Sequence, residues 1–124
     1  MFAHEGRHSI DRVVLGDQYR ALGSKLIEYR GRLSQIAFSE YPKLELSNML
    51  SGVSSTPTGQ SNKMIIDVIE NWITNNVKSI SDYNTKQLPL AQVYKLTDAQ
   101  IISAIQAVDP FYIDFIKITY RFDN

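Results

Sequence analysis

An apolar seam with helical spacing runs through the first third of the chain and constrains the fold more than any other feature. Its members step alternately by four and three residues: Leu15, Tyr19, Leu22, Leu26, Tyr29, Leu33 and Ile36. Steps of this kind keep one stripe of a helix against a neighbouring helix over three heptads. The seam predicts one long helix from about Ser9 to Phe38, packed either in a bundle core or against a second copy of the chain.

Three glycines interrupt this helical pattern, at Gly16, Gly23 and Gly31. Each costs a helix interior about 1 kcal/mol relative to alanine, so the glycines either weaken the helix or admit a close neighbour. Gly16 and Gly23 lie one heptad apart, which favours the close approach of a neighbouring helix.

Further helices are predicted along the rest of the chain. Pro42 suits a first helical turn, and Gly52 suits the end of a short helix. Residues 51–62 are rich in Ser, Thr, Gly and Pro, which predicts a flexible loop. From Ser61 to Ile80 a wide apolar stripe with helical period predicts the second long helix.

The C-terminal third carries helix-start signals. Thr97 and Gln100 form the pattern of a capping box before an apolar run. Asp109 and Pro110 place a cap residue and a first-turn proline before residues 110–122. That last segment is rich in aromatic and β-branched residues, which favours a strand. Because no second strand is evident to pair with it, a helix is the prediction.

The predicted fold class is therefore all-α, a small helical bundle of five to six helices with one long N-terminal helix. A length of 124 residues suits one domain with one core, so residues 1–124 are predicted to be a single helical domain. Residues 1–8 are expected to be a loosely held N-terminus.

Composition and motifs exclude several classes of function. The chain has no cysteine, so disulfides and thiolate metal sites are excluded. Nothing resembles a phosphate-binding loop, a membrane span or a signal peptide, so no cofactor is expected and the expected location is the cytoplasm. The formal net charge is zero, which does not favour nucleic-acid binding through phosphate contacts. A non-enzymatic protein is predicted.

One motif runs against that prediction. The residues HEGRH contain His4, Glu5 and His8 in the spacing of a helical zinc hydrolase, in which the Glu is the general base. A catalytic zinc needs at least three protein ligands, and the chain has no third histidine. We therefore expect no metal site and an ordinary solvated N-terminus, with incidental metal binding or a zinc hydrolase through His4 and His8 as remote alternatives.

Surplus aromatic residues indicate a protein partner or a homo-oligomer, because Tyr and Phe are enriched where proteins meet. The predicted partner-binding or oligomer residues are Leu15, Tyr19, Leu22, Leu26, Tyr29, Leu33, Tyr112, Phe115, Tyr120 and Phe122. The alternative is a nucleic-acid-binding transcription regulator that uses the first helix or the C-terminal helix pair. Its contact residues would be Arg7, Arg12, Arg20, Arg30, Arg32, Lys117 and Arg121.

Two stretches resemble small phage late-gene regulators of the antitermination kind. Residues 39–73 combine a Tyr-Pro element, a Ser/Pro/Gly-rich loop and an acidic-apolar helix, and residues 101–122 are similar to the helix before their DNA-binding segment. The basic helix-turn-helix of those proteins has no counterpart up to Asn124, so no DNA-contact residue carries over. The resemblance implies a phage-type regulatory protein in the host cytoplasm that binds host machinery, such as a defence complex or RNA polymerase.

Overall fold

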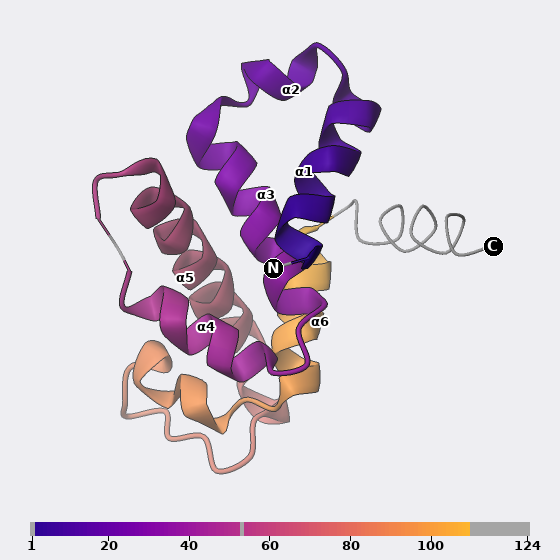
Figure 1. Cartoon of the computed structure of the whole chain (residues 1–124). Coiled ribbons are helices and arrows are strands. Elements are labelled where there is room, and N and C mark those ends of the chain that lie inside the picture. The colour runs from indigo at the N-terminus through magenta and orange to yellow at the C-terminus, as the bar shows by residue number, and fades with distance from the viewer. Residues whose placement is uncertain (1, 53, 110–124) are drawn as a thin grey trace, which may run out of the picture.

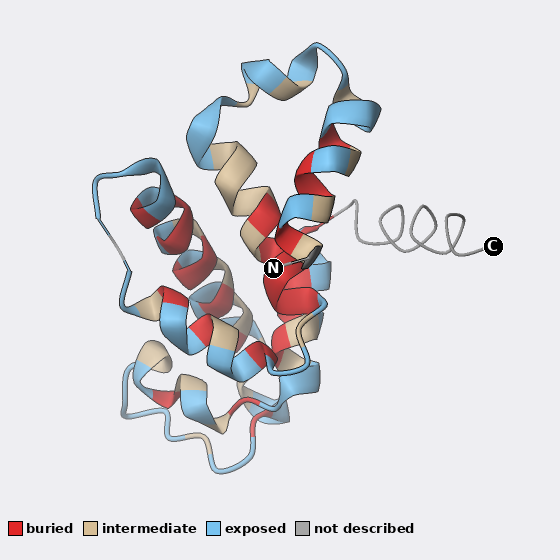
Figure 2. Cartoon of the chain, in the orientation of Figure 1, coloured by how far each residue is buried: buried red, intermediate tan, exposed pale blue. Residues whose placement is uncertain are grey.

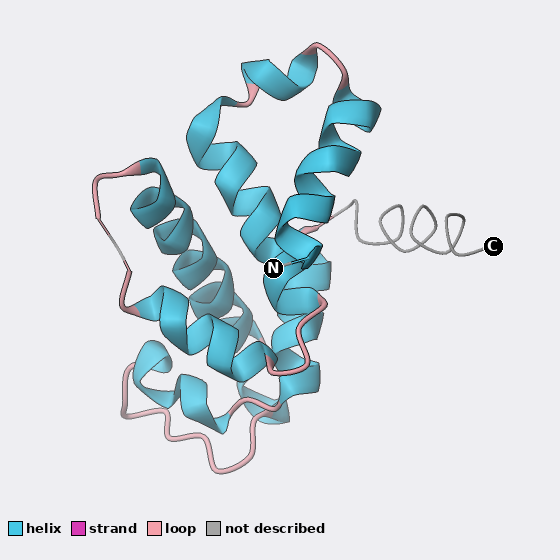
Figure 3. Cartoon of the chain, in the orientation of Figure 1, coloured by secondary structure: helices cyan, strands magenta, loops and turns pink. Residues whose placement is uncertain are grey.

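The structure is a computed structural model that describes residues 2–52 and 54–109. In this part of the chain the regular elements are all helices (Figure 1, Figure 3). They are α1 (Phe2–Leu15), α2 (Gln18–Ala21), α3 (Gly23–Ala37), α4 (Pro42–Leu50), α5 (Pro57–Asn75), α6 (Asp98–Val108) and two 3-10 helices, η1 (Val77–Ser79) and η2 (Pro89–Lys95). The prediction of a small all-α bundle is confirmed. The prediction for residues 110–122 lies outside the described residues.

The N-terminal helix differs from its prediction. In place of one helix from Ser9 to Phe38, the chain forms α1, α2 and α3. The breaks fall at Gly16 and Gly23, whose φ angles of 56° and 81° lie in the left-handed region that glycine adopts without steric cost. The chain reverses there, so α1 and α3 run side by side in opposite directions (Figure 1).

Two segments expected to be loose are helical. Residues 2–8 form the first half of α1 and bury His4, Arg7 and His8, so they are not the loosely held terminus that was expected. The predicted loop over 51–62 is shorter than expected, because α5 begins at Pro57. Thr56 caps this helix by accepting a hydrogen bond from the Gly59 backbone N–H.

The central helix is α3, which packs against α1, α4, α5 and α6. The hydrophobic core lies where α3, α4, α5 and α6 meet, and α1 adds a separate row of buried polar residues (Figure 2). The core consists of Leu33, Ile36, Ala37, Leu46, Met49, Ile65, Ile69, Ile73, Ile80, Leu96, Ile101, Ala104 and Ile105.

This packing divides the apolar seam into two parts. The inner seam, Tyr29, Leu33 and Ile36, belongs to the core or packs against it. The outer seam, Leu15, Tyr19, Leu22 and Leu26, lies outside the core cluster and is half-buried. It follows α1, α2 and α3 to the end of the molecule that lies farthest from α4 (Figure 1).

The predicted capping box at the start of α6 is present. Thr97 Oγ1 accepts from the Gln100 backbone N–H at 3.1 Å, and Gln100 Oε1 accepts from the Thr97 N–H at 2.9 Å. We expect Thr97→Ala to lower the free energy of unfolding by about 1 kcal/mol, because an amide of the first turn loses its acceptor. Urea denaturation measures this loss. Thr97→Ser keeps the hydroxyl and is the control; equal losses for both variants would contradict the cap.

Candidate functional site

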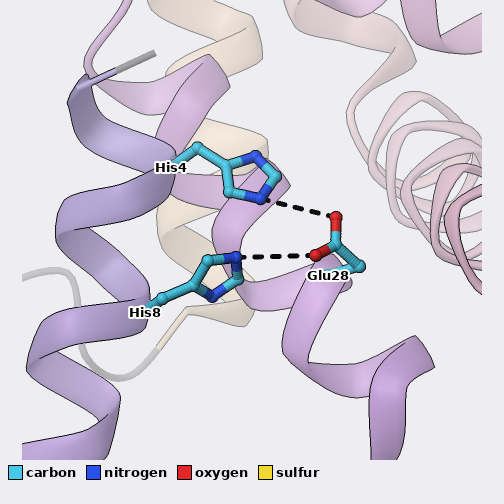
Figure 4. A group of neighbouring side chains, drawn as sticks. All are labelled: His4, His8 and Glu28. Atoms are coloured by element: carbon cyan, nitrogen blue, oxygen red, sulfur yellow. Dashed lines mark ion pairs between the residues drawn. The ribbon is translucent and has the colours of Figure 1, made fainter.

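Two histidines and a glutamate meet between α1 and α3. His4 and His8 lie one turn apart on α1, and both point toward Glu28 of α3 (Figure 4). His4 Nε2 lies 3.4 Å from Glu28 Oε2, and His8 Nε2 lies 3.5 Å from Glu28 Oε1. One carboxylate therefore faces two imidazoles, with a different oxygen toward each. Both histidines are buried, which overturns the expectation of a solvated terminus.

Gly31 makes room for the two imidazole rings. It lies on α3 almost one turn after Glu28, and a Cβ at this position would lie 2.8 Å from His4 Nε2 and 2.9 Å from His8 Cε1. No side chain fits at these distances unless the rings move. Gly31 thus admits the neighbouring helix α1. The close approach predicted at Gly16 and Gly23 is wrong, because a Cβ at either position would meet no described atom within 4 Å.

A chain of hydrogen bonds fixes the His4 ring. Gln35 Nε2 donates to Glu45 Oε2 at 2.7 Å, which turns the amide oxygen of Gln35 toward His4. That oxygen lies 3.0 Å from His4 Nδ1 and can only accept, so Nδ1 carries the proton. In the neutral ring, Nε2 then presents its lone pair toward Glu28.

His8 is held differently. Its Nδ1 is buried without a hydrogen-bond partner among the described residues, so only Nε2 faces a polar group. Burial lowers the pKa of His8, and the neighbouring His4 lowers it further. Both causes favour the neutral ring, the form that has a lone pair available.

Glu5 and Arg7, which also belong to the motif, take different places. Glu5 is exposed and does not belong to the cluster, so it does not occupy the general-base position of a zinc hydrolase. Arg7 is almost completely buried, with 1% of its surface exposed.

Arg7 joins α1 to α3 and to the end of α6. Its guanidinium donates to Asp109 through Nη1 at 2.7 Å and through Nη2 at 2.9 Å. It also donates to Ser34 Oγ at 3.0 Å and, through Nε, to Asp11 Oδ1 at 3.0 Å. Asp11 accepts two further bonds from Arg30. Two arginines thus balance two aspartates, which is how a folded chain tolerates buried charge.

The pKa values reflect this balance. Burial opposes the charged form of Asp11, but the Arg30 hydrogen bond and the Arg7 charge outweigh it and lower the pKa of Asp11. Burial likewise opposes the charged form of Arg7, and the hydrogen bond and charge of Asp109 outweigh it and raise the Arg7 pKa. Both groups therefore remain ionised within the network.

No family model, curated protein or solved structure matches this chain.

The predicted partner-binding residues fall into three groups. The outer seam is half-buried, and Val13 and Val14 beside it are 82% and 46% exposed. Leu33 is buried and Tyr29 packs on the core, so these two serve the bundle itself. The predicted residues of the C-terminal segment, Tyr112, Phe115, Tyr120, Phe122, Lys117 and Arg121, lie outside the described residues.

The arginines predicted to contact nucleic acid do not form one surface. Arg12 and Arg20 are exposed and, with Tyr19, line a hollow of about 590 Å³ beside α2. Arg7 is buried, and Arg30 is turned toward Asp11 with 15% of its side chain exposed. Arg32 is half-buried. Pairing with buried carboxylates removes Arg7 and Arg30, two of the five predicted arginines that the structure describes, from nucleic-acid contact.

Sequence reasoning missed two features. Glu28 and Gln35 had no signal of their own, because their relation to His4 depends on the reversal of the chain at α2. A second apolar surface was also missed, around Tyr41 and Leu44 of the α4 region, which are 65% and 60% exposed and line a hollow of about 460 Å³.

None of the described helices is long and apolar enough to cross a membrane.

Proposed function

We propose that this protein is a small, non-enzymatic, phage-type regulator that acts by binding a protein partner through the outer seam. The observation that supports the proposal most directly is that the apolar seam divides into an inner part in the core and an outer part outside it. Four regularly spaced apolar residues continue past the core, and no element of the described chain buries them fully. Apolar surface of this kind, with charged groups beside it, is typical of protein interfaces.

The charges around the outer seam indicate the chemistry of the partner. Arg12, Arg20 and Lys25 are exposed there, against one exposed carboxylate, Asp17. The Arg12 guanidinium lies 5.4 Å from the centre of the Tyr19 ring, so an arginine and an aromatic ring present a combined surface. A protein with an apolar strip bordered by acidic side chains complements this end of the bundle.

A protein partner is favoured over nucleic acid for two reasons. The overall charge is balanced, and Arg7 and Arg30 are engaged inside the molecule. Nucleic-acid binding draws its affinity from several phosphate contacts, which the few exposed cations of this end supply poorly. The resemblance to phage late-gene regulators supports a regulatory role for such a contact.

Capture from a bacterial host lysate, followed by affinity measurement with the purified partner, tests the proposal. We expect Leu22→Ser to weaken binding by at least about tenfold, because a central apolar contact is lost. Leu44→Ser on the α4 surface is the matched control and retains binding. Circular dichroism checks that both variants fold.

Three results would contradict the proposal. The first is that Leu44→Ser abolishes partner binding and Leu22→Ser leaves it intact. Another is capture that disappears on nuclease treatment, which would favour the nucleic-acid alternative. The third is a dimer that light scattering detects in the wild type and not in Leu22→Ser, which would assign the outer seam to a second copy of the chain.

A further inference from the structure

We propose that His4, His8 and Glu28 bind a zinc ion that links α1 to α3. The three residues supply two imidazole nitrogens and a carboxylate, a ligand set that zinc accepts with a fourth position left for water. Their ligand atoms all lie within 4.8 Å of one another. This site is separate from the outer seam and does not depend on the proposed partner.

The distances agree with a shared ion. Zinc binds nitrogen and oxygen at about 2.0–2.2 Å, so neighbouring ligands of a tetrahedral site lie about 3.4 Å apart. Each imidazole nitrogen lies at about this spacing from one of the two Glu28 oxygens, 3.4 Å for His4 and 3.5 Å for His8, and the ligand atoms of the cluster lie within 4.8 Å of one another.

The hydrogen bonding of His4 makes its Nε2 available as a metal ligand. Gln35 accepts from Nδ1–H, so in the neutral ring the lone pair of Nε2 faces a carboxylate oxygen of Glu28. Two electron-rich atoms facing each other repel, and either protonation of Nε2 or a metal ion bound by both atoms removes that repulsion. Metal-binding histidines characteristically donate their other N–H to an oxygen in this way, which fixes the ring and its tautomer.

Gly31 provides the space that the site needs. It removes the side chain that would displace both imidazoles, and it does so on the same helix as Glu28. If Gly31 served only to let two helices pack closely, any side chain of α1 could fill the space. The space is instead filled by the two imidazole rings whose Nε2 atoms face the Glu28 carboxylate.

Three protein ligands with a position left for water are typical of a catalytic zinc, but the general base of the motif does not face this position, so the role that we assign to the ion is to link α1 to α3. Glu5, the general base that the HEGRH spacing predicts, is exposed and lies outside the cluster. An ion between α1 and α3 would instead fix the spacing of the two helices that carry the outer seam. The gain is in the stability of the folded chain, because the unfolded chain has no preformed site.

Calorimetric titration with zinc chloride tests the proposal on untagged protein first stripped with a chelator. We expect one zinc ion per chain and a rise in Tm on loading. Glu28→Gln keeps the shape of a half-exposed side chain and lowers zinc affinity at least about tenfold, as does His8→Asn. Replacement of zinc by Co²⁺ gives the visible absorption of a site with four or five ligands.

Glu5→Gln is the matched control, because it changes a carboxylate of the same motif that is not a ligand. It retains the zinc affinity of the wild type. Absence of zinc uptake by the wild type overturns the proposal, and so does a Glu28→Gln variant that is folded by circular dichroism and binds zinc as the wild type does. An equal loss in Glu5→Gln and Glu28→Gln overturns the assignment of ligands.

Discussion

Arg7→Met is expected to lower the free energy of unfolding by about 3–5 kcal/mol, the usual cost when one partner is removed from a buried ion pair. The change takes both guanidinium hydrogen bonds from Asp109 and one from Asp11, in a site where Arg7 is 1% exposed. The two carboxylates keep their desolvation cost and lose the charge that offset it. Urea denaturation followed by circular dichroism measures the difference.

A surface pair with the same spacing provides the control. Lys63 and Asp67 also form an i,i+4 ion pair, but both side chains are more than half exposed. Lys63→Met removes the same kind of partner at the surface and should change stability by less than about 1 kcal/mol. Similar losses for the two variants would mean that the Arg7 network contributes no more than a surface ion pair.

Ile36→Ala is expected to lower the free energy of unfolding by about 2–5 kcal/mol, because the Ile36 side chain is fully buried and its removal leaves a cavity in the core. Leu22→Ala removes a residue from the same seam at a half-buried position, where about 1 kcal/mol or less is expected. The two losses in the free energy of unfolding are expected to differ, although both residues occupy equivalent positions of the same apolar seam.

Thermal and urea unfolding of both variants measure this contrast. If Leu22→Ala destabilises the purified protein as much as Ile36→Ala does, the outer seam is part of the folding core, and it is then not free for a partner. A smaller loss for Leu22→Ala agrees with a surface that is kept for binding.

Local signals predicted much of the fold. The proline at the start of α4, the apolar stripe of α5 and the capping box of α6 each depend on residues a few positions apart, and the structure has helices at all three places. These signals act through the first turn of a helix or along one face of it. A single sequence therefore carries them in full.

The long N-terminal helix could not be judged in the same way. A heptad seam is compatible with one straight helix and with two helices that fold back on each other. The cost of Gly16 and Gly23 in a helix interior was visible, but their spacing by one heptad favoured close packing as their explanation. The structure uses them as left-handed residues that reverse the chain, and the packing of α3 between α1 and α5 decides between the two outcomes.

The candidate site follows from that reversal. The two histidines are recognisable in the sequence, but Glu28, Gly31 and Gln35 come next to them only when α3 runs back along α1. Arg7 was expected only as a possible nucleic-acid contact, and the structure buries it. Its burial depends on Asp109, 102 positions away, and no local pattern indicates a pairing over that distance.

The same distance has a consequence for the order of folding. A contact between residues 7 and 109 closes a loop that contains most of the chain, and the entropy lost on closing a loop grows with its length. We expect this contact to form after the rate-limiting step, once α3, α5 and α6 have packed. Interactions that are absent from the transition state slow unfolding and leave the folding rate nearly unchanged. Arg7 would then slow the unfolding rate and so prolong the lifetime of the native state.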